Sequence, residues 1–307
     1  MDLTRCWFYT GSFTNISENI NATYDFGIEW GDGTKTDYYK NINAVGNYLP
    51  VKHTYAKKGV YTATLTGDCD NLYQTGDTGY KDRIVNLKEC LWGVKVPKNC
   101  VSPLKYAHAS FFGCERLAYL GKGVFDNCTD CKTIRHLFDG AAIEYFHEYT
   151  LSGLKNLTDA QYCFEACKMK GIHPDIFKPT PNITSFFHSF HRCDKLKEIP
   201  SGLFDYTPKA TNFKLCFRSC TAIEKLPENL FAKCPLISDV TECFAGGRIN
   251  GSDLAYNKYM SIGLNQTETQ NLPPLWNTHP GIAHGNYATG CIHASNYKEA
   301  VSRGWAF

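Results

Sequence analysis

A row of phenylalanines recurs along the middle and C-terminal parts of the chain at an almost constant spacing. The row comprises Phe111, Phe138, Phe164, Phe190, Phe217 and Phe244. Successive members are 27, 26, 26, 27 and 27 positions apart. Other apolar residues and prolines keep fixed offsets from each phenylalanine, with polar residues between them. A period in the twenties with apolar residues at fixed offsets is typical of a solenoid, in which stacked units share one core.

Two consecutive units carry the full pattern, 27 positions apart. The matched residues are Cys193, Leu196, Ile199-Pro200, Leu203-Phe204 and Pro208 in the first unit, and Cys220, Ile223, Leu226-Pro227, Leu230-Phe231 and Pro235 in the second. Before the ladder phenylalanines, residues 183–186, 210–213 and 237–240 have apolar ends with polar residues between. We expect a short strand or extended turn in each of these segments, and a return of the chain along the Leu-Phe segment. Each buried phenylalanine is expected to contribute about 1.5–3 kcal/mol to stability.

These repeats resemble the BspA-like leucine-rich repeats of bacterial surface proteins and phage proteins. The resemblance covers roughly residues 84–305. It implies a leucine-rich-repeat solenoid over residues 87–307, with repeats of 26–27 residues.

The end of the repeat region departs from the regular period. The Leu-Phe position recurs only at Leu275-Trp276, and Trp276 follows Phe231 by 45 positions instead of 27. About eighteen additional residues are therefore expected, as an insertion at about residues 248–270. We expect Cys291 to Phe307 to form a terminal cap, because solenoids need capped ends for solubility.

Residues 1–86 follow a different pattern. The alternating run Phe26–Trp30 leads into Gly31-Asp32-Gly33-Thr34, a turn in which glycine supplies the positive φ and the aspartate bonds its own backbone. His53-Thr-Tyr55 comes some twenty residues later. Residues 59–66 then alternate in steps of two, which predicts a half-buried strand.

These three motifs resemble the PKD domain, an immunoglobulin-like β-sandwich, over residues 24–66. The stretch from Tyr38 to Pro50 departs from the family, in which a shorter loop is commoner. Residues 6–9 and 83–87 are expected to add a first and a last strand. The resemblance implies an N-terminal Ig-like β-sandwich over residues 1–86. The predicted fold class is therefore mainly β with short helices and turns, a sandwich followed by a solenoid.

Charge and hydropathy limit the class of partner. The 32 basic and 30 acidic residues leave a net charge of +2, which provides no general attraction to nucleic acid or to an anionic membrane. No apolar run approaches the roughly 20 residues that span a bilayer. The N-terminus lacks the apolar run of a signal peptide. We expect either a protein that leaves its cell by another route, such as lysis, or one whose leader has been removed.

The fifteen cysteines are predicted to be mostly thiols in the core. Ten of them occupy repeat positions that apolar residues fill in other units, and free cysteine packs readily as a small apolar residue. These are Cys114, Cys128, Cys131, Cys163, Cys167, Cys193, Cys216, Cys220, Cys234 and Cys243. An odd total and the absence of a leader also favour thiols over disulfides.

Each candidate metal or catalytic residue has a simpler structural explanation. Cys128-x-x-Cys131 near His136 has a spacing suited to zinc, but the second half of such a site is missing and both cysteines fall in core positions. Asp32 is explained by its turn rather than by catalysis or calcium binding. The histidines show no paired spacing, and no catalytic motif stands out. We expect no catalytic residues, no metal and no cofactor.

The sequence predicts a non-enzymatic structural or adhesion protein. The resemblance implies a surface component of a phage virion, a head decoration or a tail or fibre accessory, as in phages of Bacteroides-type bacteria. Its partners would be other virion proteins and a host surface glycan or protein, with no nucleic acid and no membrane insertion. The alternatives are a bacterial cell-surface adhesin or glycan-binding protein and, third, an enzyme with a site on the solenoid. Tyr256 and Tyr259 are candidate binding residues, or they pack the insertion onto the repeats.

Overall fold

The chain is largely non-helical, with short strands joined by turns. The computed structural model describes residues 5–10, 21–45, 49–57, 59–68, 93–96, 107–223, 226–245, 275–279, 281–283 and 297–305. At this level the predicted fold class, mainly β with short helices and turns, agrees with the structure. The longest helix within these ranges has six residues, so none of the described helices could cross a bilayer.

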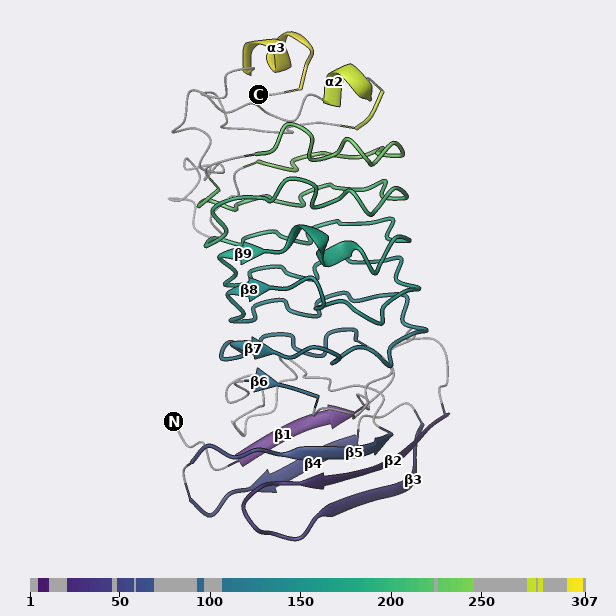
Figure 1. The fold of residues 1–307 in the computed structure, drawn as a ribbon, viewed down its shortest axis with the longest axis vertical. Coiled ribbons are helices and arrows are strands. Elements are labelled where there is room, and N and C mark those ends of the chain that lie inside the picture. Colours follow the sequence, from purple (N-terminus) through teal and green to yellow (C-terminus); the bar gives the residue numbers. More distant parts are fainter. Residues whose placement is uncertain are drawn as a thin grey trace.

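Five strands form the N-terminal part of the chain, drawn in purple and blue in Figure 1. They are β1 (Arg5–Thr10), β2 (Asn21–Glu29), β3 (Asp37–Val45), β4 (Leu49–Thr54) and β5 (Thr64–Asp68). β1 pairs with β4, and a second sheet has the order β3-β2-β5. All of these pairings are antiparallel.

The structure confirms only some of the strands that the sequence pattern predicted. Residues 6–9 lie in β1 and residues 26–29 in β2, as expected. The strand expected over residues 59–66 begins only at Thr64, because its partner β2 ends at Glu29, which pairs with Thr64. The long middle segment, expected as an enlarged loop, supplies most of β3 and the start of β4. The expected last strand, residues 83–87, lies outside the described residues.

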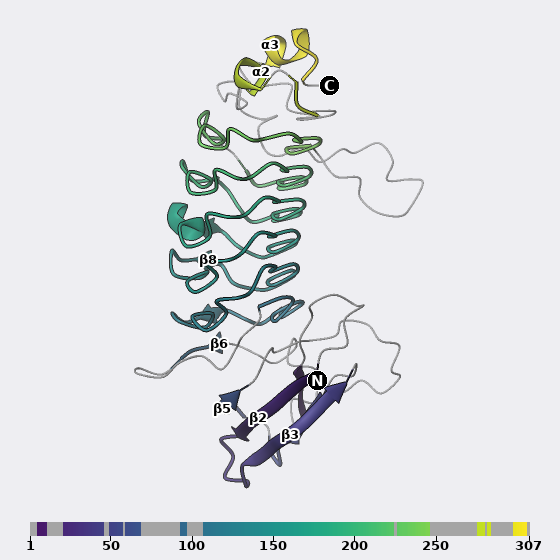
Figure 2. The ribbon, with the colours of Figure 1, turned by 90° about the vertical axis from the view of Figure 1, so that its right-hand side faces the viewer.

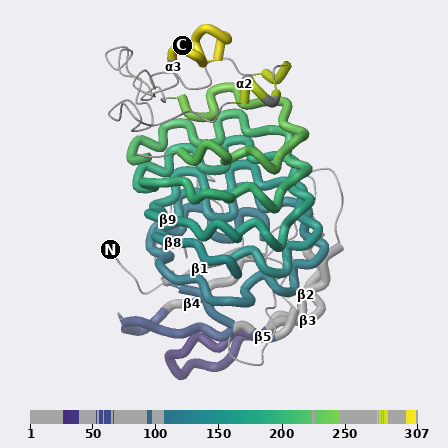
Figure 3. The backbone as a smooth tube through the Cα atoms, turned by 45° about the horizontal axis from the view of Figure 1, so that its top comes forward, coloured from purple at the N-terminus to yellow at the C-terminus, as the bar shows by residue number. Residues whose placement is uncertain are grey.

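Residues 107–245 wind into a stack of coils, seen from two sides in Figures 1 and 2 and with its top tilted forward in Figure 3. Each coil contains one ladder phenylalanine, and positions are counted from it. Parallel bridges join one residue of each coil to its equivalent in the next. The bridged residues are, in order, Thr133, Asp159, Ser185, Asn212, Asp239 and Ala283. The predicted extended segment before each phenylalanine therefore exists, as a bridge of one residue.

The six ladder phenylalanines lie on top of one another inside the stack. Adjacent rings are stacked, with centroids 5.0–5.9 Å apart. A second column runs through Phe177, Phe204 and Phe231, at 5.9 and 5.8 Å. Leu151 takes the corresponding position between Phe125 and Phe177, in the coil that lacks the Leu-Phe pair. All of these rings are buried, so the predicted column is observed.

Backbone hydrogen bonds hold successive coils in register. The amide of each ladder phenylalanine from Phe111 to Phe217 donates to the carbonyl just before the next ladder phenylalanine, at 2.7–3.0 Å. These bonds satisfy backbone groups that burial would otherwise leave unpaired. They also fix the rotation of each coil against its neighbour, so side chains at one position form a straight column.

Each coil bends through residues in the left-handed region. At position −2 these are Ala109, His136, Tyr162, His188, Leu215 and Glu242, with φ between 49° and 60°. Position +2 also has positive φ, at Gly113, Gly140, Ala166, Arg192 and Ser219. A left-handed residue other than glycine costs about 1–2 kcal/mol. Inter-coil bonds offset this cost, as in the bond from the His188 amide to the Lys214 carbonyl at 3.2 Å.

A small polar side chain opens each of these bends, at position −5. Its oxygen accepts a hydrogen bond from the backbone amide two residues later, at 2.8–3.4 Å. The residues are Thr133, Asp159, Ser185, Asn212 and Asp239, all of types that form such turns. The repeat pattern contained this signal, but the sequence analysis did not use it.

The remaining elements lie along the stack and near its C-terminal end. They are β6 (Gly93–Val94), β7 (Tyr119–Leu120), β8 (Tyr145–Phe146), β9 (Gly171–Ile172), the 3-10 helix η1 (Pro174–Phe177), α2 (Leu275–Thr278) and α3 (Tyr297–Ser302). The bridge from Asp239 to Ala283 spans 44 positions instead of 27, so 17 additional residues separate these coils. This agrees with the insertion of about eighteen. Ala300 and Trp305, from the expected cap, are buried in the core of the stack.

Candidate functional site

The candidate residues predicted from the sequence differ in whether the structure supports their predicted roles. Tyr256 and Tyr259, with the insertion that carries them, lie outside the described residues. Cys128 and Cys131 are buried, as their core positions predicted. The Cys131 thiol donates to the Thr133 carbonyl at 3.0 Å. Among the described residues, His136 groups with two carboxylates and not with these cysteines.

Asp32 has the turn role that the sequence predicted, with φ of 75° at Gly31 and 81° at Gly33. Its Oδ1 accepts hydrogen bonds from the Thr34 amide at 3.1 Å and the Thr34 hydroxyl at 2.7 Å. Its Oδ2 lies 2.8 Å from Nε2 of His53. The Thr34 hydroxyl is the main cause that lowers the pKa of Asp32 to about 2. Both carboxylate oxygens are therefore committed to the turn and its neighbour.

The N-terminal sequence motifs converge on this turn. The His53 ring stacks on Trp30 at 4.5 Å, and the Tyr55 hydroxyl donates to the Trp30 carbonyl at 3.2 Å. The Trp30 indole also donates to Asp37, at 2.7 Å. Residues 21 or more positions apart are thus joined into one aromatic cluster. The geometry of this cluster gives its residues a structural role.

The richest arrangement of functional groups lies on the outside of the coils, over the left-handed bends. We call it the outer stripe and define it by the side chains at positions −3, −2 and +1 of successive coils. Apart from the buried Ala109, Leu215 and Ala245, its members are His108, Phe112, Arg135, His136, Asp139, Gln161, Tyr162, Glu165, Phe187, His188, His191, Lys214, Arg218, Thr241 and Glu242. All of them are partly buried, so each has one side packed against the stack and one side open to solvent.

Aromatic and imidazole rings form a continuous series of contacts along the outer stripe. Phe112 meets His136 edge-on at 5.8 Å, and His136 stacks on Tyr162 at 4.7 Å. Tyr162 contacts His188 at 5.0 Å, and His188 contacts His191 at 4.6 Å. The series crosses four coils without a break, because position −2 repeats at each level of the stack.

Ionisable groups lie beside these rings at position +1, with two acidic residues followed by a histidine and an arginine. From the second coil onward the column contains Asp139, Glu165, His191 and Arg218. Three close pairs result, each between an acidic and a basic or imidazole group. They are His136 with Asp139 at 2.9 Å, His191 with Glu165 at 2.9 Å, and Arg218 with Glu242 at 3.1 Å.

Partial burial changes the acidity of several stripe groups. Burial lowers the pKa of His188 to about 4, with a further contribution from His191. It lowers the pKa of His108 to about 4 as well. Burial raises the pKa of Asp139, which the Glu165 carboxylate raises further, while His136 opposes the shift. The His188 ring is consequently neutral at neutral pH, with a lone pair on one of its two nitrogens.

A second surface feature is a shallow groove of about 560 Å³ on the coils. It is lined by Asp130, Lys132, Asn156, Thr158, Asn182, Thr184 and Lys209. Its side chains bond the stack itself: the Thr184 hydroxyl donates to the Thr158 carbonyl at 3.0 Å, and the Asn156 amide to the Thr129 carbonyl at 2.9 Å. Because these groups already connect adjacent coils, the groove is a weaker candidate than the outer stripe.

The sequence analysis missed the outer stripe. It found no paired spacing among the histidines, and the structure corrects this. His188 and His191 are three positions apart on one bend, and their Nδ1 atoms are 3.3 Å apart. The spacing of the ladder phenylalanines could have identified these residues, because positions −2 and +1 can be read from the sequence coil by coil. That spacing did not indicate that these positions face outward.

Ten cysteines of the coils are buried thiols. Three of them donate from Sγ to a backbone carbonyl of the preceding coil over 3.3 Å or less, which adds a hydrogen-bonding role to the predicted apolar one. These bonds are Cys167 to Ala141 at 3.3 Å, Cys193 to Phe164 at 3.0 Å and Cys220 to Phe190 at 2.9 Å.

Alkylation should separate these thiols from reactive ones. Burial raises the pKa of Cys167 and Cys234 to about 12 and that of Cys193 well above its usual range. Thiolate is the reactive form, so iodoacetamide at pH 8 is expected to leave all ten unlabelled in the native protein and to label them in denaturant. Peptide mass spectrometry measures this. Native labelling of Cys193 would contradict the buried column.

No protein-family model matches the chain, and no curated protein sequence matches it. The functional assignment therefore depends on the geometry of the outer stripe and on the motifs of the sequence.

Proposed function

We propose that the chain is a non-enzymatic attachment protein in which a rigid stack of repeats presents the outer stripe to a protein or glycan partner. In this proposal the two antiparallel sheets belong to a PKD-like, Ig-like β-sandwich of residues 1–86. The stacked coils belong to a BspA-like leucine-rich-repeat solenoid of residues 87–307. The division into domains follows the sequence motifs.

The observation that carries the proposal is the unbroken ring series of the outer stripe. Aromatic residues and arginine are enriched where binding energy concentrates, because they offer large contact areas together with polar groups. Here the rings are held by backbone bonds between coils, so little conformational freedom is lost when a partner binds. The paired acidic and basic or imidazole groups beside the rings supply hydrogen-bond donors and acceptors for orientation.

The chemistry of the described thiols also favours binding over covalent catalysis. Ten cysteines of the coils are potential nucleophiles, and all ten lie buried inside the stack. Burial raises the pKa of Cys163, Cys216 and Cys243 well above the usual range, which keeps these thiols protonated. The groups that face solvent on the outer stripe are instead rings, carboxylates and cations suited to non-covalent contacts.

The location of the protein follows from the resemblance. PKD-like and BspA-like motifs together support a surface component of a phage virion, a head decoration or a tail or fibre accessory. Its partners would be other virion proteins and a host surface glycan or protein. The second candidate is a bacterial cell-surface adhesin or glycan-binding protein, which the same stripe would serve. Tyr256 and Tyr259 of the insertion are proposed as additional contacts.

Substitution of Tyr162 tests the contact surface. Tyr162→Asn removes the central ring of the stripe, and asparagine tolerates the left-handed backbone at this position, where φ is 58°. The expected result is a loss of affinity for host cells of about 30-fold, since a central aromatic contributes about 2 kcal/mol or more. The measurement is binding of the labelled full chain to intact cells.

Two controls make the result specific. Tyr206→Ala removes an exposed tyrosine that lies outside the stripe and should leave affinity unchanged. Deleting residues 248–270 tests the insertion separately. Equal cell binding by the wild type and Tyr162→Asn would refute the role of the stripe. Electron microscopy of particles labelled with an antibody to the chain tests the virion, and unlabelled particles beside labelled cells would favour the adhesin.

A further inference from the structure

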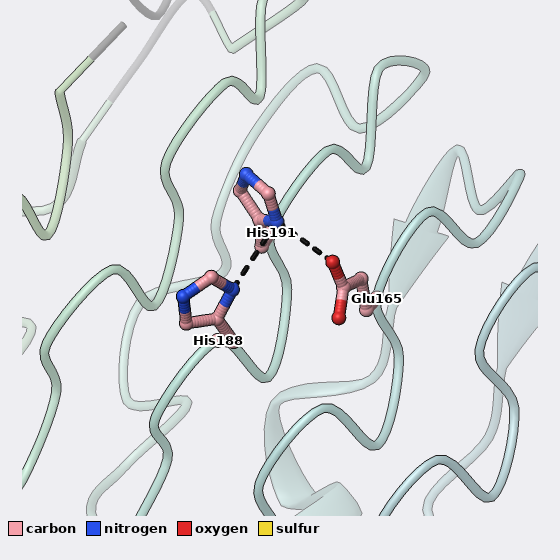
Figure 4. A group of neighbouring side chains, drawn as sticks. All are labelled: Glu165, His188 and His191. Atoms are coloured by element: carbon pink, nitrogen blue, oxygen red, sulfur yellow. Dashed lines mark hydrogen bonds and ion pairs between the residues drawn. The ribbon is translucent and has the colours of Figure 1, made fainter. Parts of the chain in front are cut away.

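Three side chains of the outer stripe converge on one point (Figure 4). His188 and His191 come from one bend, and Glu165 comes from the coil below. His191 Nδ1 lies 3.3 Å from His188 Nδ1 and 2.9 Å from Glu165 Oε1. One ligand atom of each residue lies within 4.8 Å of the others.

Hydrogen bonds alone do not satisfy this arrangement. If the proton is on His191 Nδ1, it is donated to Glu165. The Nδ1 atoms of His188 and His191 then share only that one hydrogen. If His188 Nδ1 carries the proton, the lone pair of His191 Nδ1 faces the Glu165 carboxylate at 2.9 Å. A neutral imidazole nitrogen is either a donor or an acceptor. Three electron-rich atoms therefore meet around at most one shared proton, whereas a cation would satisfy all three.

We propose that Glu165, His188 and His191 form a binding site for one divalent transition-metal ion, with Zn²⁺ as the first candidate. The site goes beyond the attachment function and does not depend on it.

The distances suit a tetrahedral ion. Zinc bonds histidine nitrogen at about 2.0–2.1 Å and carboxylate oxygen at about 2.0–2.2 Å, so its ligand atoms lie about 3.3–3.4 Å apart. The two Nδ1 atoms are already at 3.3 Å, and Glu165 needs to withdraw from His191 by a few tenths of an ångström. Two imidazoles and a carboxylate favour Zn²⁺, Co²⁺, Ni²⁺ or Cu²⁺, whereas Ca²⁺ and Mg²⁺ prefer oxygen ligands.

The backbone holds the three ligands in place. The Ala166 amide donates to the His191 carbonyl at 2.7 Å, and the Gly140 amide donates to the Glu165 carbonyl at 2.8 Å. The His188 amide is anchored to the next coil at 3.2 Å. Ligands on such fixed elements lose little freedom when an ion binds.

The site also has access to solvent. The side chains of His191 and Glu165 are 15% and 20% exposed. Three protein ligands leave one tetrahedral position for water or for a donor group of a bound partner. The ion would lie on the outer stripe itself, beside the Tyr162 and His188 rings.

A neighbouring set of residues competes for the same carboxylate. His136, Asp139 and Glu165 form a second group of possible ligands, one coil lower. His136 Nδ1 already pairs with Asp139 at 2.9 Å, so one proton satisfies this pair completely. Among the described residues, His188 and His191 have one carboxylate partner between them, Glu165, which makes their group the better site.

Metal binding by the full chain tests the proposal. Equilibrium dialysis with Co²⁺, followed by displacement with Zn²⁺, gives the number of ions and their affinity. The visible spectrum of bound Co²⁺ indicates nitrogen and oxygen ligands, while thiolate ligation adds a charge-transfer band in the near ultraviolet. We expect one ion with nitrogen and oxygen ligation. His188→Asn, which preserves the left-handed backbone, and His191→Gln should each weaken metal binding. The loss of affinity should exceed the factor of about 10 to 100 that the loss of an outer-shell partner costs.

The matched control is His147→Asn. His147 is an exposed histidine that stacks on Tyr149 at 4.9 Å, outside the stripe, and its loss should leave metal affinity unchanged. Thermal unfolding without metal reports whether each variant folds. Glu165→Gln, which keeps the shape of the side chain, decides the question if His188→Asn does not fold.

Three outcomes would overturn the site. They are unchanged affinity in all three ligand variants, a thiolate band for the bound ion, and loss of the ion in His136→Asn with retention in His188→Asn.

Discussion

Replacing Phe190 with alanine is expected to lower the free energy of unfolding of the coils by about 3–5 kcal/mol. The Phe190 ring is fully buried and stacks on Phe164 at 5.1 Å and on Phe217 at 5.0 Å. Its removal leaves a cavity that both neighbouring coils border, and backbone bonds between coils limit how far the stack can collapse into it. The measurement is urea denaturation monitored by hydrogen-exchange mass spectrometry of the ladder amides.

Phe187→Ala is the matched control for this substitution. Phe187 lies three residues earlier on the same coil and is only partly buried, with edge contacts to Tyr162 at 5.3 Å and His188 at 4.4 Å. Its loss removes less buried area and opens no internal cavity, so the effect should be clearly smaller. Similar losses for the two variants would mean that the phenylalanine column is not a main source of stability.

Gly153→Ala is expected to destabilise the stack by about 2–5 kcal/mol, the sum of a left-handed alanine at about 1–2 kcal/mol and overpacking at about 1–3 kcal/mol. Gly153 has φ of 91°. An added Cβ would collide with the Phe125 carbonyl oxygen and lie 2.6 Å from the Asp126 Cα, both in the coil below. Because these atoms belong to the backbone, relief requires the two coils to separate. Chemical denaturation with the same exchange readout measures the change.

Gly140→Ala separates the collision from the backbone conformation. Gly140 has φ of 71°, but a Cβ there would have its nearest neighbour, the Gly113 Cα, at 3.5 Å. The equivalent positions in other coils carry Ala166, Arg192 and Ser219 with φ of 51°, 61° and 62°. This variant should lose at most the left-handed cost of about 1–2 kcal/mol. If it were as damaging as Gly153→Ala, close packing of coils at Gly153 would not be the cause.

The core of the stack could be predicted because the same large residues recur at the same offsets. Phe190, Phe217 and Phe244 are 27 positions apart, and their rings stack at 5.0 and 5.8 Å. A repeated apolar residue has one common environment, the interior, so periodicity alone indicates burial. The same reasoning correctly placed Cys193 and Cys220 in the core. It did not predict their bonds to carbonyls, which depend on backbone direction.

The outer stripe could not be predicted in this way, because residue type changes from coil to coil at its positions. Position −2 contains His136, Tyr162 and His188, and only the shared left-handed backbone relates them. Glu165 and His191 are 26 positions apart in the chain, yet their side chains are 2.9 Å apart. Such contacts arise between levels of the stack, where the sequence contains no local signal.

The N-terminal strands show a different limit. Alternation over residues 59–66 predicted one continuous strand, and the structure begins β5 at Thr64. A strand requires a partner as well as a suitable pattern, and β2 ends at Glu29, immediately before the Trp30–Gly33 turn. The turn itself was predictable, since Gly31 and Gly33 both require positive φ.

The amino-acid pattern alone was sufficient for the period of the coils, the column of phenylalanines and thiols inside them, the extra residues before Ala283 and the turn at Asp32. These features follow from local residue type or from repetition, which a linear chain displays directly. The outward face of the coils, the ring series from Phe112 to His191 and the meeting of Glu165 with two histidines required the folded chain. They depend on left-handed bends and on the rotation of one coil against the next, which hydrogen bonds between coils establish.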